Sequence, residues 1–213
     1  LNMLRNAVGD SAFFKSLNLY LKTNAFKSTE AHQLRLAFEE VTGRDMNWFF
    51  NEWYFGKSFP QLDISYKYND AAGTVTVILQ QIQKEAKVWQ IPMAIDVYAG
   101  GKKERHNIFM DNRIDSFTFS YTTRPDLVNV DADKVVLAKI DDHRAFSTYA
   151  YQYAHAPNYM DRRIAIDEAA DAQATNPEAL KVLQQALNDK YHGLRSYTIS
   201  KLNLTYSNIK GVL

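Results

Sequence analysis

The sequence predicts a multi-domain α and β protein in which an all-α helical segment, an antiparallel β-sandwich and an α-α HEAT-like superhelix follow one another. Three successive patterns of apolar residues indicate these parts. Apolar residues recur at helical spacing over residues 1–56, alternate with polar residues over 57–140, and return to helical spacing over 141–213. We expect these three ranges to be three domains, and 213 residues are enough for them.

Four short helices are expected within residues 1–56, where glycines and aspartates mark their ends. Gly9 and Gly43 fit the C-terminal ends of the first and third helices, because glycine accepts the left-handed conformation that often closes a helix. Asp10 and Asp45 fit N-terminal caps of the second and fourth helices. Gly56 ends the fourth helix. These signals predict a small helical domain before the first strand.

Short strands are expected after Pro60, where the apolar period changes to two residues. Gly100 and Gly101 form the clearest hairpin signal, because both accept the positive φ of a tight turn. No helical pattern intervenes, which favours an antiparallel sandwich. The expected strands are LDISYKY, TVTVILQQI, PMAIDVYA, NIFM, DSFTFSY, LVNV and KVVLAKI.

Helical spacing returns near Asp141, and Asn176 with Pro177 supplies an N-cap and a first-turn proline for one of these helices. Two of the helices share a pattern 33 residues apart, a period typical of helical repeats. Such arrays need several repeats, so further repeats are expected downstream. The corresponding positions are Arg162, Ile164 and Ile166 in the first copy and Arg195, Tyr197 and Ile199 in the second.

Composition excludes several classes of function. The absence of cysteine excludes disulfides, cysteine-based zinc sites and a thiol nucleophile. The net charge of +1 is spread evenly, so we expect no nucleic-acid partner. No apolar run approaches the roughly 20 residues that span a bilayer, so we expect no membrane segment. These features leave the cellular compartment open.

Chemical motifs are not apparent in the sequence. None of the five histidines stands in HExxH or another close metal-ligand spacing, and no GxSxG, P-loop, GxGxxG or EF-hand pattern occurs. We therefore expect no catalytic, cofactor-binding or metal-ligating residue in this chain. The histidines are His32, His106, His143, His155 and His192.

The aromatic run DMNWFFNEWYF has two interpretations. Trp48, Phe49 and Trp53 share roughly one helical face and could form an exposed platform for sugars or bases. Alternatively, they could be a structural contact between the helical segment and the first strand. Each ring can remove about 150–250 Å² from water, which favours burial and hence the structural interpretation.

Residues 1–68 closely resemble the zinc aminopeptidases of the aminopeptidase N family, in which a similar segment closes the catalytic domain and a β-sandwich follows. Beyond residue 68 the resemblance depends on domain order. The matching positions are Met3, Leu4, Arg5, Gly9, Asp10, Phe13, Tyr20, Leu21, Phe26, Thr29, Leu34, Glu39, Glu40, Gly43, Asp45, Phe49, Phe50, Trp53, Pro60 and Leu62.

The resemblance implies a parent enzyme whose zinc is held by an HExxH helix and a later glutamate, with a tyrosine that stabilises the oxyanion. All of these residues are expected upstream of Leu1, because the chain starts without Met and already reads as a helix. The resemblance thus implies no cofactor in this fragment and zinc in the parent. Peptide substrates are expected to bind through the missing catalytic domain.

We therefore expect the C-terminal structural portion of a zinc-dependent aminopeptidase that removes N-terminal residues from peptides. The fragment would support the catalytic lobe and the substrate chamber, and would be inactive alone. Two alternatives stay open: a catalytically dead family relative acting as a scaffold, and a free-standing protein-interaction module.

Overall fold

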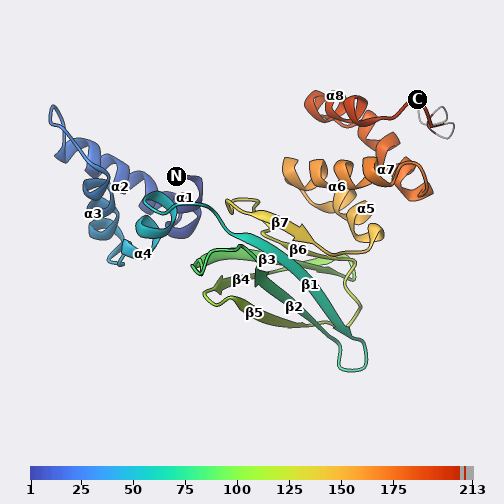
Figure 1. Cartoon of the computed structure of the whole chain (residues 1–213), viewed down its shortest axis with the longest axis horizontal. Helices are drawn as coiled ribbons and strands as arrows, with labels where there is room; N and C mark the ends of the chain where they lie inside the picture. The colour runs from blue at the N-terminus through green and yellow to red at the C-terminus, as the bar shows by residue number, and fades with distance from the viewer. Residues whose placement is uncertain (207–208, 210–213) are drawn as a thin grey trace.

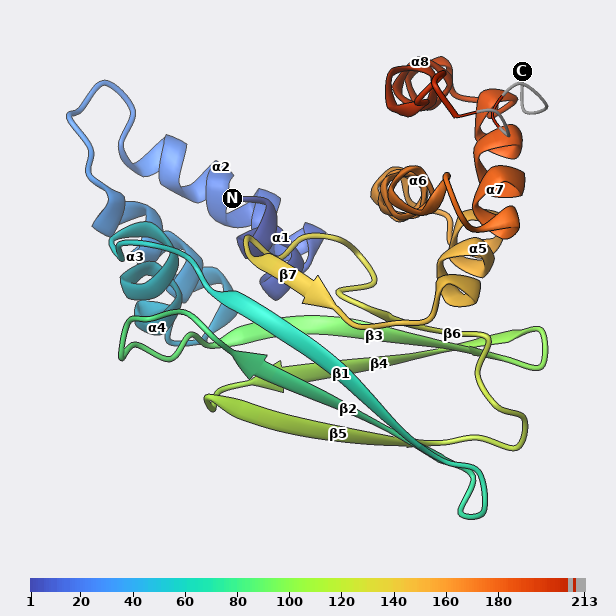
Figure 2. The ribbon, with the colours of Figure 1, turned by 45° about the vertical axis from the view of Figure 1, so that its right-hand side comes forward.

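The computed structural model describes residues 1–206 and residue 209, and arranges them as two groups of helices joined by a two-sheet unit (residues 61–142) (Figure 1). The first group lies at the left of Figure 1 in blue, and the second lies at the upper right in orange and red. Figure 2 shows the same separation from a second direction. The first group consists of α1 (Asn2–Val8), α2 (Asp10–Thr23), α3 (Ala31–Thr42), α4 (Asn47–Phe49) and the π-helix η1 (Phe50–Tyr54).

The first group of helices packs around its own apolar core. Phe38, Leu4 and Phe50 are almost fully buried there, as the helical spacing of apolar residues predicts. Gly43 closes α3 in the left-handed conformation, which confirms its role. Asp10 is not a cap, because it is the first residue of α2 and its carboxylate instead accepts two bonds from Arg5 at 2.7 Å.

The fourth helix forms, but the prediction of a regular α-helix there is wrong. Only one turn, α4, is α-helical, and the backbone then widens into η1, where the Phe55 N–H donates to the Phe50 carbonyl five residues earlier. α4 begins after Met46, although the Asp45 side chain accepts the Asn47 N–H at 2.8 Å. A π-turn shifts later side chains around the helix axis, so the 3.6-residue period does not predict where Trp53 points.

The central unit contains two sheets that share one core. β5, β2, β1 and β7 form one sheet in that order, and β4, β3 and β6 form the other. Inward-facing residues of both sheets, such as Ile64, Leu79 and Ile95, lie in the same buried cluster. The strands are β1 (Gln61–Asn69), β2 (Thr74–Gln81), β3 (Ile91–Ala99), β4 (Lys102–Met110), β5 (Ile114–Ser120), β6 (Leu127–Val130) and β7 (Lys139–Asp142).

Two predictions about the sheets are wrong. Only the end of the expected strand KVVLAKI lies in a strand, β7, and the sheets are not purely antiparallel. Residues 135 and 136 do not pair with a strand, because their N–H groups donate to the Asp131 carboxylate at 3.1 Å. The chain instead crosses from β6 in one sheet to the edge of the other, where β7 pairs parallel with β1. A crossover, unlike a hairpin, permits parallel pairing.

β4 is longer than the expected segment NIFM, since it begins at Lys102. Its first half carries charged, exposed residues on an edge strand, where charge discourages pairing with other chains. This half lacks the apolar alternation by which strands are recognised, so the sequence pattern did not reveal it.

The second group of helices also has a core of its own, which includes Ile166, Leu183 and Leu194. Asn176 caps its third helix by accepting the Glu178 N–H at 2.9 Å, with Pro177 in the first turn, as predicted. The helices are α5 (Phe146–His155), α6 (Tyr159–Ala172), α7 (Pro177–Leu187) and α8 (His192–Lys201). Within residues 1–206 and 209, no helix is long and apolar enough to cross a membrane.

The 33-residue correspondence between α6 and α8 holds for the arginines and fails at its last position. Arg162 donates to the Asp189 carboxylate at 2.6 Å, and Arg195 donates to the Asp189 carbonyl at 2.8 Å. Ile166 is fully buried, whereas Ile199 is 61% exposed.

Candidate functional site

The aromatic run lies at a contact between the first helices and the two-sheet unit, which we call the seam (residues 48–55 with residues 87–90). Phe49 and Phe50 are buried in the helical core, whereas Trp53 packs against both that core and the core of the sheets. The Trp53 ring centroid lies 4.7 Å from that of Trp89, and its Nε1 donates to the Gln90 carbonyl at 3.2 Å. Burial of Phe49 and partial burial of Trp48 and Trp53 confirm the structural interpretation of these three rings.

Polar and charged side chains also contribute to the seam. The Glu52 carboxylate accepts the Gln90 N–H at 2.8 Å, and the Lys87 ammonium lies 3.6 Å from the centre of the Trp89 ring. Partial burial raises the pKa of Glu52, while the Gln90 N–H and the Lys87 charge oppose that rise. Gly56 is required here, because a Cβ at this position would collide with the Glu52 carbonyl. The seam is therefore held by ring contacts, hydrogen bonds and charge together.

An apolar groove of about 360 Å³ lies beside the seam. Leu4, Phe50 and Trp53 form its helical wall, and Val136 and Leu137 form the wall from the two-sheet unit. Tyr54 and Phe55, by contrast, are 58% and 45% exposed, so the structural interpretation does not extend to every ring of the run. These apolar surfaces suit contact with protein better than chemistry, since they carry few polar groups.

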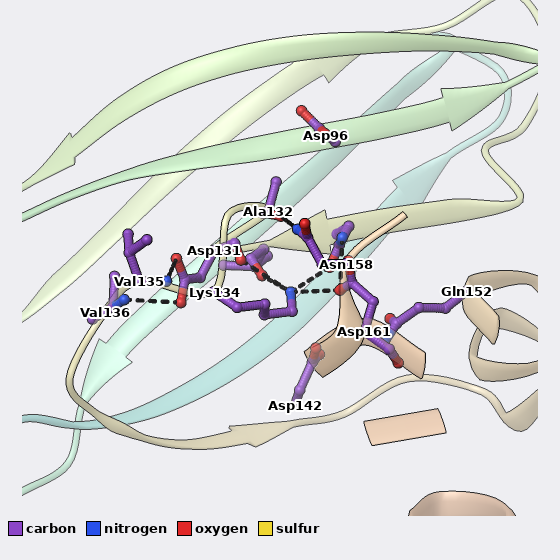
Figure 3. Close-up of polar contacts among 12 residues, drawn as sticks. Asp96, Asp131, Ala132, Lys134, Val135, Val136, Asp142, Gln152, Asn158 and Asp161 are labelled. Atoms are coloured by element: carbon purple, nitrogen blue, oxygen red, sulfur yellow. Dashed lines mark hydrogen bonds and ion pairs between the residues drawn. The ribbon is translucent and has the colours of Figure 1, made fainter. Parts of the chain in front are cut away.

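A second contact, which we call the joint, connects the two-sheet unit to α5 and α6 through buried polar side chains (Figure 3). Arg144 follows β7 and is 6% exposed; its Nε lies 2.9 Å from Asp142 Oδ2, and its Nη1 donates to Gln152 Oε1 at 2.8 Å. Gln152 in α5 donates onward to the Asp161 carbonyl at 2.8 Å. The guanidinium thereby connects β7, α5 and α6.

Burial makes Asp142 dependent on its neighbours. Burial raises the pKa of this carboxyl group, and Arg144 and the hydroxyl of Tyr66 partly offset the rise. Tyr66 donates to Asp142 Oδ1 at 2.8 Å, and burial followed by the Asp142 charge raises the pKa of the tyrosine well above its ordinary value. The charged form of such a carboxyl group is therefore costly without its cationic partner.

A cavity of about 510 Å³ lies between β1 and the start of α5. It is lined by three basic residues, and each already has an acidic partner. Arg124 lies 2.7 Å from an Asp70 oxygen, His143 lies 2.8 Å from an Asp63 oxygen, and Arg144 is paired as described above. The hydrogen bond to Asp63 raises the pKa of His143. We assign this cavity no ligand.

In the part of the chain that the structure describes, no group of three His, Cys, Asp or Glu side chains could hold a metal ion. The histidines lie apart: His32 contacts Phe55, His106 stacks on Phe119, and His155 stacks on Tyr151. His143 pairs with Asp63, and His192 lies beside Tyr191. The residues present therefore do not fit a zinc ion.

Sequence reasoning missed the residues of the joint. Asn129, Lys134, Arg144 and Asp161 are spread over more than thirty positions and match no motif. One signal was available, because Asn129 interrupts the apolar strand LVNV at a position that proves fully buried. A buried amide needs partners, and such a residue points to a polar network.

Comparison with known proteins gives three findings. Residues 1–53 match the Peptidase family M1 domain. Aminopeptidase N of Caulobacter vibrioides is 33% identical over 76 residues, and aminopeptidase N of Lactococcus lactis is 29% identical over 100 residues. These segments cover 36% and 44% of this chain but only 9% and 11% of the relatives' length.

The fold has a similar counterpart among solved structures. Aminopeptidase A of Legionella pneumophila, solved in complex with aspartic acid, superposes with a TM-score of 0.75 at 14% identity. The superposition covers 94% of this chain and 25% of that protein. At this low identity it shows that the two folds are similar and shows nothing about an active site. Residues 1–53 thus resemble the Peptidase family M1 domain in sequence, and most of the chain resembles the Legionella aminopeptidase A in fold.

Proposed function

We propose that this chain is the C-terminal supporting portion of a zinc-dependent aminopeptidase that removes N-terminal residues from peptides. Residues 1–56 would complete the catalytic domain, 57–140 would form a β-sandwich, and 141–213 would begin a HEAT-like superhelix. The observation that carries the proposal is Trp53, which ends the segment matching family M1 and packs against both neighbouring cores. A single side chain thus connects the family segment to the two-sheet unit.

The proposed division of labour follows from what each surface offers. The first helices expose Leu1, Phe14 and Leu21 at 71%, 56% and 65%, and these apolar side chains suit a contact with the rest of a catalytic lobe. The two-sheet unit would set the spacing between that lobe and the helices. The second group of helices would form one wall of the substrate chamber. Zinc, held by residues outside this chain, would polarise the peptide carbonyl and activate water.

The assay that tests the proposal measures hydrolysis of aminoacyl 4-nitroanilides by the purified chain, with added zinc and with a chelator. We expect no rate above the protein-free control and no zinc retained after gel filtration. The aminopeptidase N of Caulobacter vibrioides serves as the positive control. Zinc-dependent hydrolysis that the chelator abolishes would refute the supporting role.

A chimera tests whether this chain can support an active enzyme. The 76-residue segment of the Caulobacter enzyme that matches this chain is replaced by the matching residues of this chain. Retention of zinc-dependent activity supports an enzymatic parent, whereas a folded, zinc-loaded but inactive chimera favours the scaffold alternative. A chain that is monodisperse alone and binds a partner protein through the two-sheet unit or the second group of helices would favour the interaction module.

A further inference from the structure

The ammonium of Lys134 lies within a shell of four oxygen atoms at the joint (Figure 3). Its Nζ lies 2.6 Å from Asn129 Oδ1, 2.9 Å from the Val130 carbonyl, 3.0 Å from the Asp131 carbonyl and 3.0 Å from Asp161 Oδ1. Ordinary surface ion pairs of lysine involve one carboxylate and water. A shell built mostly from neutral oxygens instead resembles the site of a free monovalent cation. In such a site, protein oxygens take the place of the water molecules around the ion.

The only formal charge in the shell is deeply buried. The Asp161 side chain has no exposed area, and the Lys134 side chain is 12% exposed. Asp161 Oδ1 also accepts the Asn129 amide at 3.1 Å, while Oδ2 has no hydrogen-bond partner among residues 1–206 and 209. A buried carboxylate in this position needs a cation close by, since its charge is otherwise uncompensated.

The shell is held in place by groups other than the lysine side chain. Asp131 and Lys134 both have positive φ, 48° and 52°, and the Lys134 N–H closes the turn between them by donating to the Asp131 carbonyl at 2.8 Å. The Asp131 carboxylate fixes this turn through the Val135 and Val136 N–H groups. The Asn158 amide holds the turn to α6 by donating to the Ala132 carbonyl at 2.7 Å. The turn that carries the Val130 and Asp131 carbonyls is therefore held by contacts that do not involve the lysine side chain.

We infer that residues 129–131 and Asp161 form a cation cage whose occupant is the chain's own Lys134 ammonium, and which binds a free ammonium ion once the lysine side chain is removed. The cage draws its oxygens from β6, the following turn and α6, so its cation holds the helices to the two-sheet unit. This inference is independent of the proposed function, because it depends only on contacts within the chain.

The test compares thermal unfolding of the full chain and its Lys134→Ala variant in ammonium chloride and in tetramethylammonium chloride at equal concentrations. Alanine is chosen because glycine would relieve the positive φ and confuse the result. In tetramethylammonium we expect the variant to melt about 10 °C below the native chain, as suits loss of one partner of a buried pair. Ammonium should restore about a third or more of that loss in a saturable way.

Three controls make the result specific. The native chain should show no saturable response, and neither should Lys103→Ala. In the native chain the Lys103 ammonium lies 3.2 Å from Asp96 Oδ2, and the Lys103 side chain is 41% exposed. The double variant Lys134→Ala/Asp161→Asn should lose the response, because the cage is then neutral. Equal melting of Lys134→Ala in both salts would overturn the inference. If Lys134→Ala does not fold, recovery of the fold on dialysis into ammonium alone supports the cage, and recovery in neither salt refutes it.

Discussion

Replacing Trp53 by alanine is expected to lower the free energy of unfolding by about 3 kcal/mol, near the lower end for a large aromatic because the side chain is only partly buried. The variant loses the tilted ring contact with Trp89, the hydrogen bond from Nε1 to the Gln90 carbonyl and the contact with both cores. Urea denaturation followed by circular dichroism measures the change. A shift of this size would place the seam among the main contributors to stability.

Two matched variants separate the contribution of the seam from that of an aromatic ring in general. Phe26 is fully exposed, so Phe26→Ala should change the stability by less than about 0.5 kcal/mol. Trp53→Phe retains a ring but lacks the N–H donor, and should fall between the native chain and Trp53→Ala. Equal unfolding midpoints for Trp53→Ala and Phe26→Ala would refute the structural interpretation of the aromatic run and restore the exposed platform.

Arg144→Ala is expected to cost about 3–5 kcal/mol, because it leaves the buried Asp142 carboxylate without its cation. The Gln152 side chain also loses its guanidinium donor, so β7 and α5 separate more easily. Chemical denaturation again gives the magnitude. Adding Asp142→Asn should recover part of the loss, since the amide carries no charge but still presents an oxygen to the Tyr66 hydroxyl.

Arg5→Ala is the matched control for Arg144→Ala. Arg5 also pairs with an aspartate at 2.7 Å, but both side chains are largely exposed, so the unfolding midpoint should scarcely move. The deficit of Arg144→Ala should shrink as the pH falls through the folded-state pKa of Asp142, which burial raises. The sign follows because a protonated carboxyl group needs no cation. A deficit that grows on acidification would mean that Asp142 is not the group left unpaired.

The sequence predicted elements whose signals are local. The Asn176 cap, the Gly43 C-terminus and the alternation in β1 each depend on a few adjacent residues, and each is confirmed. The π-turn at η1 was not predictable from the sequence. The run of aromatic residues fits an α-helix with a 3.6-residue period equally well, and no residue type in it signals the wider turn. β7 was misplaced because the Asp131 side chain competes for the backbone N–H groups of the apolar run that follows.

The polar joint was beyond sequence reasoning for a different reason. Asp142, Arg144 and Asp161 look like ordinary surface charges in the sequence, and they become a network only when α5 and α6 fold back over the sheets. Their burial depends on contacts between segments distant in the chain. The family resemblance, by contrast, lies within one continuous segment, and the matched family model covers residues 1–53 of it.

Two contacts, the seam and the joint, hold the first helices and the last helices rigidly to the two-sheet unit. Pulsed electron spin resonance between pairs of spin labels tests this arrangement. The chain has no cysteine, so exposed cysteines can be introduced freely at Lys15, Ser116 and Gln184. Lys15→Cys with Ser116→Cys reports on the seam, and Ser116→Cys with Gln184→Cys reports on the joint. We predict a single narrow distance for each pair, broadened for the first pair by Trp53→Ala and for the second by Arg144→Ala. Broad or multiple distances in the otherwise native chain would contradict the account.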